Sequence, residues 1–209
     1  MNIISDVTTS SQTPSISDPS LVDQTISEAL ADLERMQGDD GHWVFELEAD
    51  VTIPAEYIFL NHFLDTIDDE VEQKLANYIR RQQSAEHGGW PLYHDGEFNI
   101  SASVKGYFAL KLVGDDPDEP HMKRARQAIL DYGGAERANV FTRFALALFN
   151  QAPWHAVPVM RPEAMLLPRW SPFHIEKVSY WSRTVMIPMF VLYSLRAQAA
   201  NPRGVKIDE

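Results

Sequence analysis

The sequence predicts an all-α protein built from stacked helical hairpins. The first observation behind this prediction is a repeated loop: residues 37–43 read Gln-Gly-Asp-Asp-Gly-His-Trp, and residues 83–90 read Gln-Ser-Ala-Glu-His-Gly-Gly-Trp. The second is that the segments on both sides of these loops read as helices. A loop that recurs about one helical hairpin later is typical of helical repeat proteins.

Each loop is expected to close one helix and lead into the next. The glycine lets the backbone leave the helix, the glutamine amide can bond to orphaned backbone groups at helix ends, and the indole covers the junction with apolar area. The second loop has one extra residue between glutamine and glycine, which leaves the role of its glutamine open. The predicted structural residues are Gln37, Gly41 and Trp43 in the first loop and Gln83, Gly88 and Trp90 in the second.

The first helix is expected over residues 21–36, where apolar residues recur at helical spacing. Thr52 is predicted to cap the second helix, which runs to about Asp65. Pro54 falls in the first turn of that helix, where its missing N–H is harmless.

The next helices are bounded by recognisable start and stop residues: from Asp68 or Asp69 to about Gln83, from Asn99 or Ser101 to Gly114, from Asp118 to Tyr132, and from Asn139 to Asn150. The last of these is apolar on most sides, so we expect it to lie inside other helices. The proline-rich segment 153–172 predicts short helical turns. A final helix is predicted over residues 177–199, with a kink at Pro188.

Composition narrows the possible functions. The chain has 209 residues, 18 basic and 30 acidic, with a net charge of −12, which argues against a nucleic-acid partner. The absence of cysteine excludes disulfides, thiolate metal sites and a cysteine nucleophile. The seven histidines show no pair at metal-ligand spacing on a helix, so no metal site is predicted.

The start of the sequence and its most apolar stretch carry no targeting or membrane-spanning signal. Residues 1–19 are expected to form a disordered leader without the features of a secretory signal, followed by one incomplete helical domain over residues 20–209. The apolar run over residues 185–193 is far shorter than the roughly 20 residues of a spanning helix. It therefore predicts a buried helix.

The repeated loop resembles the QW repeat of squalene and oxidosqualene cyclases. The similarity continues through four further stretches, in an order similar to the amino-terminal part of bacterial squalene-hopene cyclases. These stretches are Ala-Glu-Tyr at 55–57, Phe-Thr-Arg at 141–143, Pro-Trp at 153–154 and Tyr-Trp-Ser-Arg at 180–183. The resemblance covers roughly residues 20 to 200.

This resemblance implies a fold and an activity. The expected fold is part of an α/α toroid, and the expected enzyme is an intramolecular transferase that folds squalene in an apolar cavity, protonates it and guides the cations to a pentacyclic hopanoid. Neither a metal nor an organic cofactor is implied. By the same resemblance, Trp181 lines the substrate cavity, where the negative face of an indole can stabilise a passing carbocation. Core packing is the alternative role for Trp181, and Tyr180 and Arg183 are expected to support its helix through packing and an ion pair.

The chain carries no catalytic residue of its own by this comparison. The family supplies its proton from an Asp-x-Asp-Asp motif, whereas the aspartates at 65, 68 and 69 have a different spacing. They lie at a helix start, where carboxylates favour the macrodipole, so capping is the expected role. Residues 115–119 are similarly interpreted as a loop and a helix start. The chain alone is therefore predicted to be inactive.

The partners follow from the same interpretation. They are squalene or a related isoprenoid bound by the complete enzyme, the remaining cyclase domain and, as an option, a membrane surface; the expected location is the cytoplasm or the inner face of a bacterial membrane. Two alternatives stay open. One is a non-catalytic helical module that binds a protein or an isoprenoid lipid, and the other is a fragment of a class II diterpene cyclase, against which the lack of a basic cluster weighs slightly.

Overall fold

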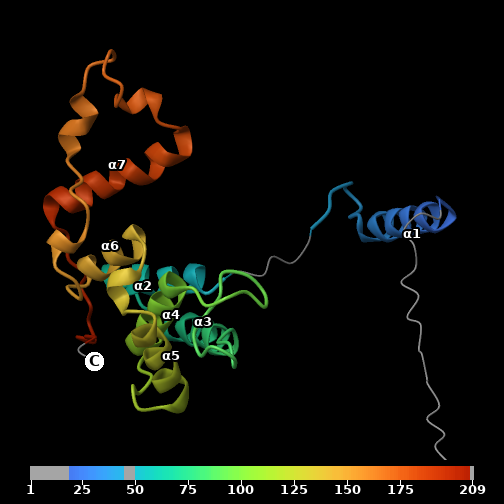
Figure 1. Ribbon diagram of the computed structural model, residues 1–209, viewed down its shortest axis with the longest axis horizontal. Coiled ribbons are helices and arrows are strands. Elements are labelled where there is room, and N and C mark those ends of the chain that lie inside the picture. Colours follow the sequence, from blue (N-terminus) through green and yellow to red (C-terminus); the bar gives the residue numbers. More distant parts are fainter. Residues whose placement is uncertain (1–18, 45–49, 208–209) are drawn as a thin grey trace, which may run out of the picture. The chain divides into compact units, whose positions relative to one another are not determined.

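The computed structural model describes residues 19–44 and 50–207, which form α-helices, short 3-10 helices and loops without any strand (Figure 1). The all-α class is therefore confirmed for the described part of the chain. The chain divides into two compact units, residues 1–48 and 49–209. The first unit contains α1 (Pro19–Met36) and the first repeated loop. The leader expected over residues 1–19 lies outside the described residues except for Pro19, which begins α1.

The helices of the second unit fall close to the predicted ranges. They are α2 (Thr52–Leu64), α3 (Asp69–Arg81), α4 (Ile100–Val113), α5 (Pro120–Asp131), α6 (Val140–Leu148) and α7 (Tyr180–Leu195). Pro188 lies inside α7, as expected. The short turns predicted over residues 153–172 are confirmed by two 3-10 helices, η2 (Trp154–Ala156) and η3 (Pro162–Leu166); η1 (Ala135–Arg137) and η4 (Ile175–Lys177) are two more.

Side-chain caps fix several helix starts. Asp68 accepts hydrogen bonds from two backbone N–H groups in the first turn of α3, which confirms its capping role, and Asn99 and Asn139 each cap a helix in the same way. The prediction that Thr52 caps α2 is wrong, because Thr52 is already the first helical residue. Instead, the carboxylate of Asp50 accepts the backbone N–H of Thr52 at 2.7 Å and also bonds its hydroxyl.

Helix α4 lies at the centre of the main hydrophobic core. Nearly all of its residues are buried, and it packs against α2, α3 and α5 (Figure 1). Three rings join α2, α4 and the end of α6: Phe108 lies 5.2 Å from Phe59 and 5.3 Å from Phe149 between ring centroids. The prediction that α6 lies inside other helices holds on one side only, because Phe141 is 50% exposed. The helix enclosed by others is α4.

The two repeated loops have the same backbone hydrogen bonds despite their different lengths. In each, the residue after the glutamine donates its N–H to the carbonyl of the residue after the glycine, at 2.8 Å in the first loop and 2.9 Å in the second. In each, the glycine N–H donates back to the residue after the glutamine, at 2.8 and 3.0 Å. The extra residue therefore only widens the turn between these two bonds.

The glutamines are equivalent as well, which answers the question left open by the extra residue. The amide of Gln37 donates to the carbonyl of Gly41 at 2.6 Å, and the amide of Gln83 donates to the carbonyl of Gly88 at the same distance. Both glycines have positive φ, 85° and 74°, which a glycine adopts without strain. Gln83 also donates to the carbonyl of His121 at 2.9 Å and so ties its loop to α5.

The tryptophans complete both motifs. The indole N–H of Trp43 donates to the carbonyl of Leu33 at 2.7 Å, and that of Trp90 donates to the carbonyl of Ile79 at 2.8 Å. Both acceptors stand four residues before the glutamine, in the last turns of α1 and α3. Trp90 is fully buried, and a Cβ added at Gly106 of α4 would come within 3.1 Å of its ring. Trp90 therefore packs directly on the backbone of α4.

A polar cluster joins the ends of α3, α4 and α5. The guanidinium Nε of Arg80 lies 2.9 Å from Oδ2 of Asp115, and Nε2 of His121 lies 2.7 Å from the same oxygen. Burial alone would raise the pKa of Asp115, but hydrogen bonds from Arg80 and His121 outweigh burial and hold this pKa below its ordinary value of 3.8. The hydrogen bond to Asp115 raises the pKa of Arg80. The ionised pair is thus the stable form.

The segment that follows α7 returns across the ends of three helices. Arg203 donates to the carbonyl of Leu112 at 2.8 Å and pairs with Glu72 at 2.8 Å and with Asp69 at 3.0 Å. Glu72 in turn lies 2.5 Å from Nε2 of the fully buried His62. Backbone N–H groups of the same segment bond the carbonyls that end α6 and α2, from Ala199 to Leu148, from Ala200 to Phe63 and from Asn201 to His62. These carbonyls lie in the last turns of their helices, where no N–H group of the same helix donates to them.

No helix among residues 19–44 and 50–207 is long and apolar enough to cross a bilayer. The apolar run at residues 185–193 lies within α7, a helix of 16 residues. The prediction that this run forms a buried helix is wrong for the described residues, because Phe190 is the one buried residue of α7 and Val185 and Val191 are each 45% exposed.

We expect replacement of Trp90 by alanine to lower the free energy of unfolding by about 3 kcal/mol or more, because it opens a cavity between α3 and α4. Replacement by phenylalanine keeps much of the apolar area but loses the bond to Ile79, so it should cost less, with about 1 kcal/mol from the lost bond itself. Urea unfolding measures both. Trp170→Ala, at a position that is 82% exposed, is the control; equal midpoints for Trp90→Ala and this control would contradict the role of the motif.

We expect Asp115→Asn to lower the free energy of unfolding by about 1–2 kcal/mol at pH 6, because Arg80 and His121 lose a charged acceptor. Since the folded pKa of Asp115 is lowered, the stabilisation is fully present above the ordinary value of 3.8 and is lost as pH falls through the folded value. The difference between the two proteins should therefore shrink below pH 3.8. Asp95→Asn, at an exposed site with φ of 52°, is a control that should show no such difference.

Candidate functional site

A second hydrophobic cluster holds α7 against α6. Its buried members are Phe144 and Ala147 of α6 and Val157 from the following loop. Trp154 links the two helices: its ring lies 5.5 Å from Phe144 and 5.6 Å from Tyr193 of α7, edge to face in both cases. This cluster positions α7 without enclosing it.

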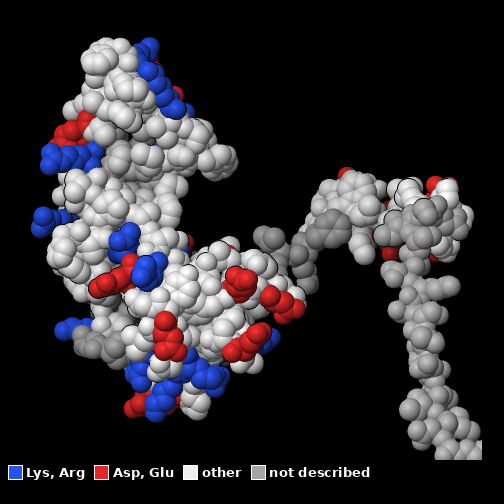
Figure 2. Space-filling model, in the orientation of Figure 1, with Lys and Arg blue, Asp and Glu red and all other residues white. Residues whose placement is uncertain are grey.

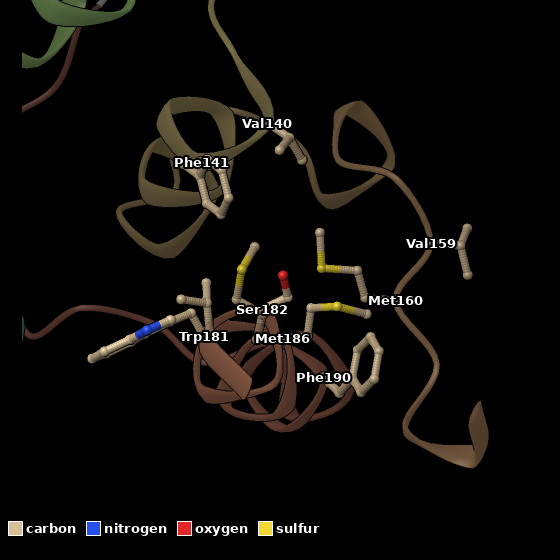
Figure 3. Close-up of a pocket in the computed structure, with 10 residues that line it drawn as sticks. Val140, Phe141, Val159, Met160, Trp181, Ser182, Met186 and Phe190 are labelled. Atoms are coloured by element: carbon tan, nitrogen blue, oxygen red, sulfur yellow. The ribbon is translucent and has the colours of Figure 1, made fainter. Parts of the chain in front are cut away.

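The remaining faces of the two helices enclose an apolar groove of about 670 Å³. In Figure 3, Phe141 from α6, Met160 from the loop before η3 and Ser182 from α7 point into the space between the helices. The full lining is Val140, Phe141, Val159, Met160, Trp181, Ser182, Val185, Met186, Met189 and Phe190. The volume lies within the usual range of ligand sites.

The chemistry of the lining is that of a hydrocarbon site. Three methionines supply flexible, polarizable surface that can adapt to an irregular apolar ligand. Ser182 has the only polar side chain apart from the indole, and its hydroxyl lies 2.8 Å from that of Ser179, the residue that caps α7. The lining holds no carboxylate or histidine. It can bind and orient an apolar molecule but has no group to protonate one.

Trp181, the residue expected to line a cavity, lies at the edge of this groove. Figure 3 shows its indole extending to one side, and it is 79% exposed. Core packing within the described residues therefore does not account for it. Tyr180, itself 65% exposed, contacts Trp181 edge to face with 5.6 Å between ring centroids. The ion pair expected for Arg183 is not formed with any described residue, because its nearest helix neighbours in the sequence are uncharged.

Most of the groove was not identified from the sequence. The sequence indicates Phe141 only as part of the Phe-Thr-Arg stretch shared with the cyclases. It predicts Met186 and Met189 as part of a buried helix. One signal was available: Ser182, Val185, Met186 and Met189 recur at the spacing of a single helix face. That spacing predicts an apolar face but not whether a neighbour covers it.

The segment between η2 and α7 carries an exposed surface of unusual composition. Its large apolar side chains at 159, 166, 170 and 173 are all mostly exposed. Lysine and arginine residues accompany them, three basic against two acidic over residues 157–179, whereas acidic residues dominate the whole chain. Figure 2 shows the basic side chains over the part of the surface where Figure 1 places this segment. An apolar surface with cationic residues favours a partner rather than free solvent.

One group among the described residues has the geometry of a metal site. Side-chain ligand atoms of Asp115, Glu119 and His121 lie within 4.8 Å of one another. The sequence prediction of no metal site did not anticipate this grouping, because its members lie on a loop and a helix start. Arg80 already binds Asp115 in a charged hydrogen bond, which supplies the positive charge that a cation would bring.

Comparison with known proteins agrees with these observations. Residues 26–209 match the family described as the squalene-hopene cyclase N-terminal domain. The squalene–hopene cyclase of Bradyrhizobium diazoefficiens is 57% identical over 195 residues, which is 93% of this chain and 29% of the relative. That of Zymomonas mobilis is 55% identical over 90% of this chain, and that of Alicyclobacillus acidocaldarius is 33% identical over 89%, each again covering 29% of the relative.

The chain thus spans less than a third of the length of these relatives. Its described helices and two equivalent Gln-Gly-Trp loops agree with the part of an α/α toroid that the sequence predicts. By fold, by loop geometry and by sequence, this chain belongs to the squalene-hopene cyclase family and corresponds to its amino-terminal domain.

Proposed function

We propose that this chain is the amino-terminal part of a squalene-hopene cyclase and that the groove between α6 and α7 forms one wall of its hydrocarbon cavity. The observation that carries the proposal is the groove itself: its ten lining residues are almost all apolar, and some of them, such as Phe141 and Trp181, are at least half exposed. Each methylene group removed from water into such a site contributes about 0.8 kcal/mol. A linear triterpene, which has no polar group, would be bound by this effect alone.

Trp181 has a distinct role in this proposal. Its exposed indole offers a π face at the edge of the groove, and such a face attracts a cation that lies within about 6 Å of the ring centre. A carbocation that forms in the cavity would therefore be stabilised as it passes this position. Tyr180 contacts the indole edge to face, and in this proposal that contact restricts its rotation.

Initiation requires a group that this chain does not supply. Protonation of an alkene needs a strong, positioned acid, and no carboxylate lines the groove. The aspartate cluster near α3 offers none, because Asp68 is already engaged in capping. In the proposed enzyme, the acid and the other cavity walls come from the portion that the longer relatives possess.

The relatives of this chain carry the names of more than one cyclic product. The dammaradiene synthase of Dryopteris crassirhizoma is 31% identical over 93% of this chain, so similar amino-terminal domains accompany more than one named product. Identities of 54–58% with four relatives named as squalene-hopene cyclases or a probable one favour a hopanoid.

The exposed surface between η2 and α7 supports the proposed partners. Its apolar side chains suit either the remaining cyclase domain or the surface of a membrane from which a lipid-soluble substrate is drawn. We propose the remaining domain as the main partner, because the groove borders this surface through Val159 and Met160.

We expect the purified chain to form no cyclic triterpene from squalene, because stabilising aromatics alone cannot generate the first cation. Incubation with detergent-dispersed squalene and analysis by mass spectrometry provides the test, with the Alicyclobacillus enzyme as the positive control. A cyclic product from the purified chain would mean that it contains an acid of its own.

The groove makes a separate prediction about binding. Squalene should change the tryptophan fluorescence of the chain, and Trp181→Phe should remove most of that change because Trp181 is the only tryptophan in the lining. Trp170→Phe removes another exposed indole that is not in the lining and should leave the change in place. Equal loss in both variants would place the hydrocarbon elsewhere.

A further inference from the structure

Helix α6 borders a second cavity, which shares no lining residue with the hydrocarbon groove. Its volume is about 480 Å³, and Arg143 and Leu146 of α6 form one side of it. The other side is formed by η1, through Glu136, and by the loop around η2, through His155. Four of its nine lining residues are polar or charged, whereas the lining of the groove is almost wholly apolar. The two cavities therefore suit different ligands.

Arg143 is incompletely bonded in this cavity. Its Nη1 donates to the carbonyl of Ala156 at 3.1 Å, which holds the guanidinium in place. Its Nε is buried and has no hydrogen-bond acceptor among the described residues. No described carboxylate lies within ion-pair distance of the guanidinium. The charge of this guanidinium is therefore not paired with any described carboxylate, which leaves it able to pair with an anion in the cavity.

The neighbouring side chains do not supply the missing acceptor. The amide of Gln151 is engaged elsewhere, because it donates to the carbonyl of Phe149 at 2.7 Å and accepts the N–H of Ile207 at 2.7 Å. Glu136 lines the cavity but is exposed and forms no ion pair with a described residue. His155 is also exposed and without a described partner.

We propose that this cavity binds a carboxylate group, which pairs with the guanidinium of Arg143 and accepts a hydrogen bond from its Nη2. A guanidinium forms strong charged hydrogen bonds with a carboxylate, and Nη1 already donates to the carbonyl of Ala156, so Nη2 is the donor left for a ligand. Glu136 at the rim makes a doubly charged phosphate a poorer ligand than a singly charged carboxylate. The carboxylate belongs either to a small molecule or to an acidic side chain of a polypeptide. This site is independent of the proposed cyclase activity.

The test follows the Nε–H resonance of Arg143 by NMR in the full chain during titration at pH 7. Acetate represents a small carboxylate, and a glutamate with both its amino and α-carboxyl groups blocked represents an acidic side chain. Both should shift the resonance in a saturable way; tighter binding of the blocked glutamate would identify a polypeptide source, and tighter binding of acetate a small molecule. Inorganic phosphate should bind more weakly than either.

Three variants test which side chains determine carboxylate binding. Arg143→Lys should weaken carboxylate binding about ten-fold, because a lysine lacks the fork. Glu136→Gln should tighten it about two- to five-fold by removing a like charge. Arg161→Gln, an arginine that does not line the cavity, is the matched control and should leave binding unchanged.

Two results would overturn the proposal. One is an Nε–H resonance that no carboxylate shifts, or that phosphate shifts at lower concentration. The other is a large shift of this resonance caused by Glu136→Gln alone in the absence of ligand, since Glu136 would then be the acceptor that Arg143 requires. Titration of wild-type chain needs no substitution at Arg143, so a folding defect in that variant does not affect the conclusion.

Discussion

The closure of helix ends by a glutamine amide and an indole is the interaction on which the second unit depends. Trp90 bonds the last turn of α3 while its ring lies on the backbone of α4 at Gly106, and Gln83 bonds both its own loop and α5. One loop therefore fixes three helices relative to one another. The same bonds recur inside the first unit, from Gln37 to Gly41 and from Trp43 to Leu33. The geometry of the motif is therefore the same in both units.

The division between two hydrophobic clusters explains how a rigid core can support an open site. The main core surrounds α4 and includes the end of α6 at Phe149. The smaller cluster holds α7 through Trp154 and leaves the outer faces of α6 and α7 uncovered. An apolar wall needs both properties, since its side chains must be held in place and yet remain accessible to the molecule that they enclose.

Local sequence signals predicted the helices and the repeated loops, whereas contacts between distant residues could not be predicted. Asp68 and Asn99 were recognisable as caps because capping depends on the next few residues only. The prediction failed at Thr52 because the helix begins one residue earlier than expected, so that Thr52 is already helical and its N–H and hydroxyl bond Asp50. Trp181 was placed in a cavity wall by resemblance, but its partners across the groove on α6 are 40 residues away in the sequence, as in the pair Phe141 and Trp181. Arg143 gave no signal, because its incomplete bonding appears only once η1 and η2 are folded around it.

The segment after α7 is synthesised long after the helices whose ends it closes. Arg203 bonds Leu112 and Asp69, which precede it by 91 and 134 residues. During synthesis from the amino end, the ends of α2, α4 and α6 therefore emerge long before the residues that close them. Native contacts at such sequence distances form late, because the intervening chain must first lose its freedom. On the ribosome, the nascent domain should pass through a stage in which its helices are assembled but their carbonyl ends are still bound to water, and it is at this stage that a chaperone would meet it.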